Sequence, residues 1–150
     1  MSVHALNVLD NSVMSVRARI AALWASATLL YIYGDVIAFY SPGGLQRMLD
    51  GKMGPLPVTP TLLLGVAILM SAPAVMVALT AVLKPVLNRW LNVVMGAAYT
   101  AVMLFTMIDA VKSGIHFYLY LGVVEVLLTL LIVWYALTWP THPLEPLPSS

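Results

Sequence analysis

The chain has 150 residues and a formal net charge of +1, and 61% of its residues are hydrophobic while 9% are charged. A soluble domain has about 45–50% apolar and about 25% charged residues, so this chain carries too few charges to cover a water-exposed surface. The near-neutral charge gives no reason to expect a nucleic acid partner, and the lack of cysteine excludes disulfides and thiolate metal sites. The composition therefore indicates a membrane protein with the lipid bilayer as its partner.

Four apolar segments are long enough to cross a bilayer, because a helical span needs about 20 mostly apolar residues. Lipid cannot satisfy free backbone N–H and C=O groups, so each segment is predicted to be a helix. The predicted spans are residues 18–40, 60–83, 86–111 and 115–139. The sequence thus predicts a single all-α membrane domain, an up-and-down four-helix bundle, followed by a disordered tail over residues 140–150.

Turn-forming residues agree with these boundaries. Residues 41–44 (Ser-Pro-Gly-Gly) end the first span, and Thr59-Pro60 supplies an N-cap and a proline at the first helical position of the second. Lys84-Pro85 and Ser113-Gly114 are predicted to form tight turns, which would make the last three spans antiparallel neighbours. The connection over 41–58 has apolar residues at helical spacing, which predicts a short helix lying in the membrane interface.

Basic residues near the spans give an orientation. Four lysines and arginines flank the side on which both termini lie, and three flank the opposite side. Cytoplasmic loops carry the excess of lysine and arginine, so both termini are predicted to be cytoplasmic. The first span lacks a small-residue cleavage site and is predicted to be retained rather than removed as a signal peptide.

Polar side chains inside the predicted spans align on single helix faces. At 100° per residue, Tyr31 and Asp35 share a stripe on the first span, and Tyr118 and Glu125 share one on the fourth. The third span aligns four polar side chains: Asn88, Asn92, Tyr99 and Thr106. Small residues beside Glu125 would allow close helix approach, so this face of the fourth span is predicted to turn toward the other helices.

Three carboxyl groups gather toward one end of the predicted bundle: Asp35, Asp109 and Glu125. A charged side chain at the bilayer centre costs about 2.5–3.5 kcal/mol on insertion scales. Glu125, the deepest, is therefore predicted to be protonated at neutral pH unless a cation binds, with the nearby tyrosine hydroxyls as candidate hydrogen-bond partners. The residues proposed for a ligand or proton site are Asp35, Glu125, Tyr31, Tyr118, Asp109, Tyr99 and Asn92.

Two interpretations of these carboxyls stay open. They could form a proton, cation or amine site in a small coupled transporter or ligand-binding protein, in which case a homodimer is expected because four short helices enclose little space. Alternatively they could form interhelical hydrogen bonds, each contributing about 0.6 kcal/mol, in a non-transporting accessory or structural protein. The sequence has no paired histidines at metal spacing and no glycine-rich phosphate loop, so no enzyme, cofactor or metal site is expected.

Pro73 is predicted to kink the second span and free a carbonyl near Ser71.

Four segments, in order, carry a family resemblance: "YIYGD", "VTPTLLLGVAILM", "VLKPVLNRWLNVVMGAAYT" and "VVEVLLTLLIVWYALTW". Over about residues 20–139, this set resembles the uncharacterised small four-helix bacterial membrane proteins grouped as a domain of unknown function. The resemblance implies four spans and a bacterial origin, and it brings no assigned activity. The predicted location is therefore the bacterial inner (cell) membrane. Asp35 and Glu125 fall on acidic positions of the family pattern. Relatives often have a glutamate within the stretch that reads Met70-Ser71-Ala72-Pro73 here.

Overall fold

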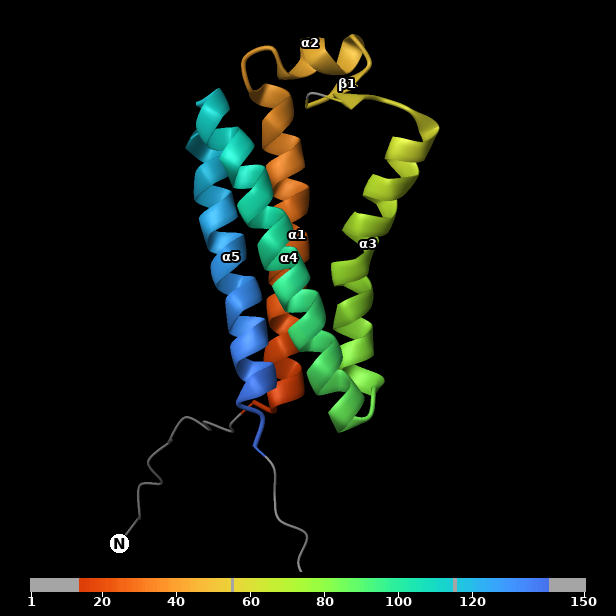
Figure 1. Cartoon of the computed structure of the whole chain (residues 1–150), viewed down its shortest axis with the longest axis vertical. Helices are drawn as coiled ribbons and strands as arrows, with labels where there is room; N and C mark the ends of the chain where they lie inside the picture. The colour runs from red at the N-terminus through yellow and green to blue at the C-terminus, as the bar shows by residue number, and fades with distance from the viewer. Residues whose placement is uncertain (1–13, 55, 115, 141–150) are drawn as a thin grey trace, which may run out of the picture.

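Four long helices make up most of the chain in the computed structural model, which describes residues 14–54, 56–114 and 116–140 (Figure 1). They run alternately up and down: α1 Val16–Tyr40, α3 Pro60–Val82, α4 Pro85–Ser113 and α5 His116–Leu137. Each is long and apolar enough to cross a membrane. The predicted all-α bundle is confirmed, whereas the tail over 141–150 lies outside the described residues.

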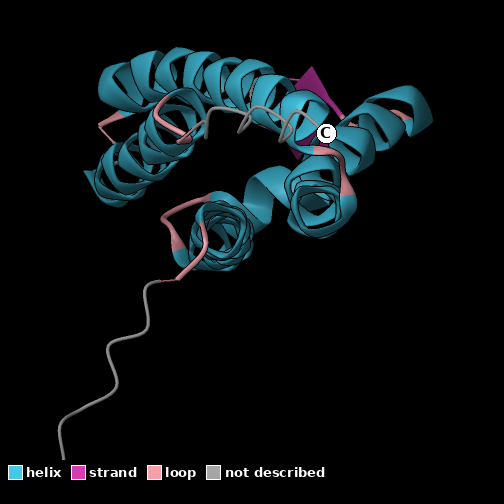
Figure 2. Ribbon diagram, turned by 90° about the horizontal axis from the view of Figure 1, so that it is seen from below, coloured by secondary structure: helices cyan, strands magenta, loops and turns pink. Residues whose placement is uncertain are grey.

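The α1–α3 connection contains a short helix, α2 (Gly44–Leu49), as predicted. It also contains an antiparallel strand pair that was not predicted, β1 (Lys52–Met53) with β2 (Leu56–Pro57), drawn in magenta in Figure 2. Gly51 and Gly54 before and after β1 have positive φ angles of 68° and 58°, a backbone conformation that glycine adopts without steric cost. Two-residue strands are too short for an alternating pattern, so sequence periodicity could not reveal them.

The helix ends follow the predicted turn residues. The side chain of Thr59 accepts a hydrogen bond from the backbone N–H of Leu62 at 3.1 Å, and α3 begins at Pro60. At the end of α4, Gly114 has a φ of 67° and donates to the last turn of the helix. Since Gly114 reverses the chain with no Cβ to strain, α4 can be followed almost at once by α5.

Helix neighbours differ in part from the prediction. α4 packs along α5, and α1 packs on both α3 and α5, but α3 and α4 approach each other only sparsely despite their short turn. The prediction that α3 and α4 are close antiparallel neighbours is therefore wrong over most of their length. Gly96 explains in part why α4 packs on α5, because a Cβ there would lie 2.7 Å from the Cγ2 of Val133 and 3.3 Å from the carbonyl oxygen of Thr129. Such small residues let α4 approach α5 rather than α3.

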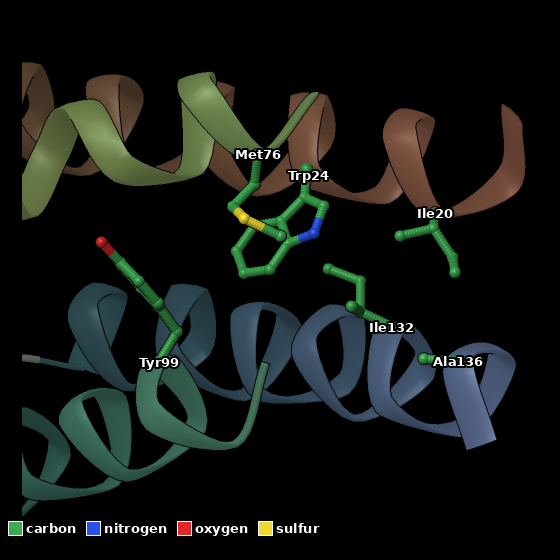
Figure 3. Packing of buried hydrophobic residues seen from close by; sticks show 6 residues of the cluster. All are labelled: Ile20, Trp24, Met76, Tyr99, Ile132 and Ala136. Atoms are coloured by element: carbon green, nitrogen blue, oxygen red, sulfur yellow. The ribbon is translucent and has the colours of Figure 1, made fainter. Parts of the chain in front are cut away.

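An apolar core fills the half of the bundle near the start of α1 and the end of α5, here called the terminal end. Figure 3 shows the Trp24 indole of α1 between Met76 of α3 and Ile132 of α5, with the Tyr99 ring of α4 on one side. The Trp24 and Tyr99 rings meet edge to face with centroids 5.7 Å apart, a favoured arrangement for aromatic pairs. This core joins all four long helices below the polar pocket described next.

Candidate functional site

A pocket lies between the four long helices in the half of the bundle nearer α2, here called the α2 end. It offers about 80 Å³ to water-sized groups, several times the roughly 10–15 Å³ that one buried water needs. Its lining includes residues of all four long helices: Tyr31, Gly34, Asp35, Leu69, Met70, Tyr99, Val102, Met103, Thr106, Tyr118, Leu121, Gly122 and Glu125. Five of the seven predicted site residues are thus brought together: Asp35, Glu125, Tyr31, Tyr118 and Tyr99.

Glu125 forms the buried part of this pocket. Its side chain is only 3% exposed, and its Oε2 atom has no hydrogen-bond partner among the described residues. The neighbouring Gly122 is buried too, and a Cβ there would lie 2.7 Å from the Cγ atom of Met107. α5 therefore sits close against α4, which leaves the Glu125 carboxyl facing the pocket rather than lipid.

The backbone beneath Glu125 is held by hydroxyl groups. Thr129 donates to the Glu125 carbonyl oxygen at 3.1 Å, and Thr100 of α4 donates to the Thr129 hydroxyl at 2.7 Å. Thr100 also lies 2.8 Å from the Gly96 carbonyl oxygen. These contacts tie the α5 turn that carries Glu125 to α4, so the position of the carboxyl is set by both helices.

A second carboxyl and three tyrosines share the pocket. Asp35 of α1 is exposed at its rim, whereas Tyr31, one turn earlier, is partly buried and its hydroxyl has no hydrogen-bond partner in the described chain. The Tyr31 and Tyr99 rings lie 6.2 Å apart, tilted by 39°. No lysine, arginine or histidine occurs among the described lining residues. The pocket therefore combines two acidic groups with aromatic rings and has no described basic side chain to neutralise them.

Pro73 shapes the α3 wall of the pocket. Because proline has no N–H, the carbonyl of Leu69, four residues earlier, loses its partner within the helix. The Tyr99 hydroxyl of α4 donates to this carbonyl oxygen. The carbonyl predicted to be freed near Ser71 is that of Leu69, two residues earlier, and the Tyr99 hydroxyl pairs it. The Tyr99 hydroxyl is consequently engaged by backbone and is not paired with a carboxyl.

Asn92, also proposed as a site residue, lies outside the pocket in a buried network at the terminal end. Its Oδ1 atom accepts hydrogen bonds from the Trp24 indole at 2.7 Å and from the Thr80 hydroxyl at 3.3 Å. Its Nδ2 group donates to the side-chain and backbone oxygens of Asn88 at 2.6 and 2.8 Å. Asn88 in turn donates to the Thr80 carbonyl oxygen at 2.6 Å. Every polar atom of the Asn92 side chain is paired, so this network joins α1, α3 and α4.

The remaining predicted residue, Asp109, lies within α4, and its side chain is outside the described part of the structure. Sequence reasoning missed the apolar lining of the pocket, notably Leu69, Met70 and Met103. Their types are those of ordinary lipid-facing residues, so only the proline four residues after Leu69 could have marked that position. Among the described residues, no group of three or more histidine or acidic side chains is placed to hold a metal ion.

A family model described as a family of unknown function (DUF6326) matches residues 13–145, which include all four long helices and the pocket. The chain belongs to this family. The sequence resemblance to a family without assigned activity is thereby confirmed. Comparisons with curated proteins and with solved structures find no match.

Proposed function

We propose that the protein is a multi-pass protein of the bacterial inner membrane that binds a proton or a small cation at Glu125 and couples this exchange to movement of a small molecule. In this proposal both termini face the cytoplasm, so the pocket is nearer the opposite surface. The observation that carries it is the buried Glu125 carboxyl in a pocket, whose Oε2 atom has no hydrogen-bond partner among the described residues. An acidic group inside a membrane is costly, and acidic groups that face the interior of a bundle or a cavity typically mark proton or ion pathways.

The surroundings of Glu125 support an exchangeable rather than a fixed partner. A purely structural carboxyl would be expected to hydrogen-bond across a helix interface, since buried polar groups are normally paired. Neither the Tyr31 hydroxyl nor the Tyr99 hydroxyl is bonded to it, although both line the same pocket. The pocket has room for water or a small ion beside the carboxyl.

The alternative is a non-transporting accessory or structural protein. The Asn92 network favours it for the terminal end of the bundle, because there every polar atom of the Asn92 side chain is used to join helices. Polar pairing of this kind stabilises a fixed arrangement and offers nothing to a ligand. The two functions therefore make different predictions about the pocket at the α2 end.

Proton flux into liposomes that contain a pH-sensitive dye tests the proposal. The full chain should give flux that the Glu125→Gln variant lacks, because an amide cannot take up or release the proton. Asp50→Asn is the matched control, since Asp50 is an exposed acid outside the pocket. It should retain the flux. Flux that survives in Glu125→Gln, or no flux from correctly folded full chain, would favour the accessory or structural alternative.

A further inference from the structure

We propose, building on the function above, that the cation bound at Glu125 is an alkylammonium ion whose charged head lies in the pocket and whose alkyl chain leaves between α3 and α4. The pocket has a buried floor and an exposed rim of different chemistry. Glu125, Gly122, Tyr99 and Met103 are buried, whereas the rim is exposed at Leu69, Met70, Val102 and Asp35. The charged group of a ligand would therefore lie at the floor beside Glu125, and its apolar part would lie at the rim beside the apolar residues of α3 and α4.

The floor fits an ammonium group better than a metal ion. An ammonium carries hydrogen-bond donors, and within the described part of the chain the Glu125 Oε2 atom and the Tyr31 hydroxyl are both buried without a partner. Tyr31 and Tyr99 also place two aromatic rings 6.2 Å apart at the pocket wall, and aromatic faces attract organic cations within about 6 Å. A hard metal ion such as Ca²⁺ takes about 6–8 oxygen ligands, and the described lining offers two carboxyl groups. The aromatic walls would add nothing to its coordination.

The volume sets the size of the head. A cavity of about 150 Å³ admits benzene, so about 80 Å³ admits a group of only a few non-hydrogen atoms. A longer substituent must therefore leave the pocket. α3 and α4 contact each other sparsely, and on their side Leu69, Met70 and Val102 are exposed and apolar. The space between these two helices is thus the path for an alkyl chain, and in a membrane it faces lipid.

The same chemistry occurs in a lipid that bears a primary amine, and the lining argues against that source. An aminophospholipid carries a phosphate next to its ammonium group. The described lining has two carboxyls and no basic residue, so the phosphate would meet like charge. We therefore assign the pocket to an amine without phosphate.

Proton and ammonium compete for one carboxyl in this arrangement. The titratable groups that share the pocket with Glu125 are Asp35 and Tyr31 of α1, Tyr99 of α4 and Tyr118 of α5, while α3 contributes none. Protonated Glu125 offers no charge to an ammonium, so amine binding should weaken as the pH falls. Binding of an amine would then release a proton, which is the exchange that the proposed function requires.

Protection of Glu125 from a hydrophobic carbodiimide tests the inference. The full chain is placed in phosphatidylcholine nanodiscs, treated with the reagent, and the modified fraction of Glu125 is measured by mass spectrometry. Octylammonium at about ten times its Kd should reduce the modified fraction about tenfold, because about a tenth of the pockets then remain empty. Uncharged octanol should not protect. Tetrabutylammonium, whose charge lies inside four alkyl chains, should not protect either.

Three results would overturn the inference even if octylammonium protects Glu125. Octanol protecting as well as octylammonium would mean that the alkyl chain alone is recognised. Protection by tetrabutylammonium would contradict the inference that the pocket admits only a small charged group. Protection by phosphatidylethanolamine nanodiscs without added amine would assign the pocket to a lipid. If octylammonium fails to protect while Glu125-dependent proton flux is intact, this inference is wrong and the proposed proton function stands. If protection occurs and no flux is seen, the binding inference stands alone.

Discussion

Replacing Asn92 by leucine should destabilise the bundle, because Asn92 is the central member of the buried network. Leucine has a similar size, so the change removes hydrogen bonds with little change in volume. The Trp24 indole N–H loses its 2.7 Å acceptor, the Thr80 hydroxyl loses a 3.3 Å acceptor, and the Asn88 side-chain oxygen loses its 2.6 Å donor. All four side chains are completely buried, so water cannot replace these partners.

The magnitude follows from the number of groups left unpaired. A buried polar group without a partner costs about 1–3 kcal/mol. The Thr80 hydroxyl can turn to a carbonyl of its own helix, which leaves two groups that have no evident alternative. Hydrogen bonds between membrane helices measured by double-mutant cycles average about 0.6 kcal/mol, so the lower part of the range applies. We expect Asn92→Leu to lower the free energy of unfolding by about 2–4 kcal/mol.

Reversible unfolding in mixed micelles, followed by circular dichroism, measures this change. Trp24→Phe is the partner variant, because it removes the indole N–H that Asn92 accepts from. In a double-mutant cycle the two substitutions should couple by about 1 kcal/mol. The second substitution lowers the free energy of unfolding by less once the first has removed the hydrogen bond. Two results together would refute the network as a stabilising element. Asn92→Leu would lower the free energy of unfolding by less than about 0.5 kcal/mol, and the effects of Asn92→Leu and Trp24→Phe would add to within about 0.3 kcal/mol.

Two further predictions concern backbone geometry. Tyr99→Phe leaves the Leu69 carbonyl unpaired and should lower the free energy of unfolding by about 1 kcal/mol. In the Pro73→Ala background the same change should be nearly neutral, because the backbone N–H restored at position 73 pairs that carbonyl. An equal cost in both backgrounds would contradict this explanation. Gly96→Ala places a Cβ 2.7 Å from a methyl group of α5 and should cost about 1–3 kcal/mol in a thermal melt. Gly65→Ala is the matched control, because beyond the local helix backbone no described atom lies within 4 Å of the added Cβ. It should not destabilise the chain, and equal effects at the two glycines would rule out close α4–α5 packing as the cause.

The helices and their ends could be predicted because the signals are local. A long apolar run specifies a span, and Thr59-Pro60 and Gly114 act on the residues beside them. The polar faces could also be predicted, since helical phase alone puts Tyr31 with Asp35 and Tyr118 with Glu125. These four residues do line one pocket.

The helix neighbours could not be predicted, because lipid removes the pattern on which such a prediction rests. In water, an apolar stripe marks the face that meets the protein, whereas lipid-facing and protein-facing residues in a membrane are equally apolar. α3 therefore gave no sign that it packs on α1 rather than on α4. For the same reason Asn92 could be placed on a polar face but not assigned to Trp24, its actual partner on another helix.

The polar face of α4 has different surroundings at its two ends, which under the proposed function would separate stability from ligand binding. Toward the terminal end, Asn88 and Asn92 have paired side chains that join three helices. Beyond Tyr99, whose hydroxyl donates to the Leu69 carbonyl oxygen, the face borders a pocket in which one Glu125 carboxyl oxygen has no partner among the residues that the structure describes. Under the proposed function, a rigid end and an open end on the same helices would let a ligand or proton come and go at Glu125 without disturbing the contacts that hold the bundle together. Changes at Asn92 should therefore alter stability, and changes at Glu125 should alter exchange.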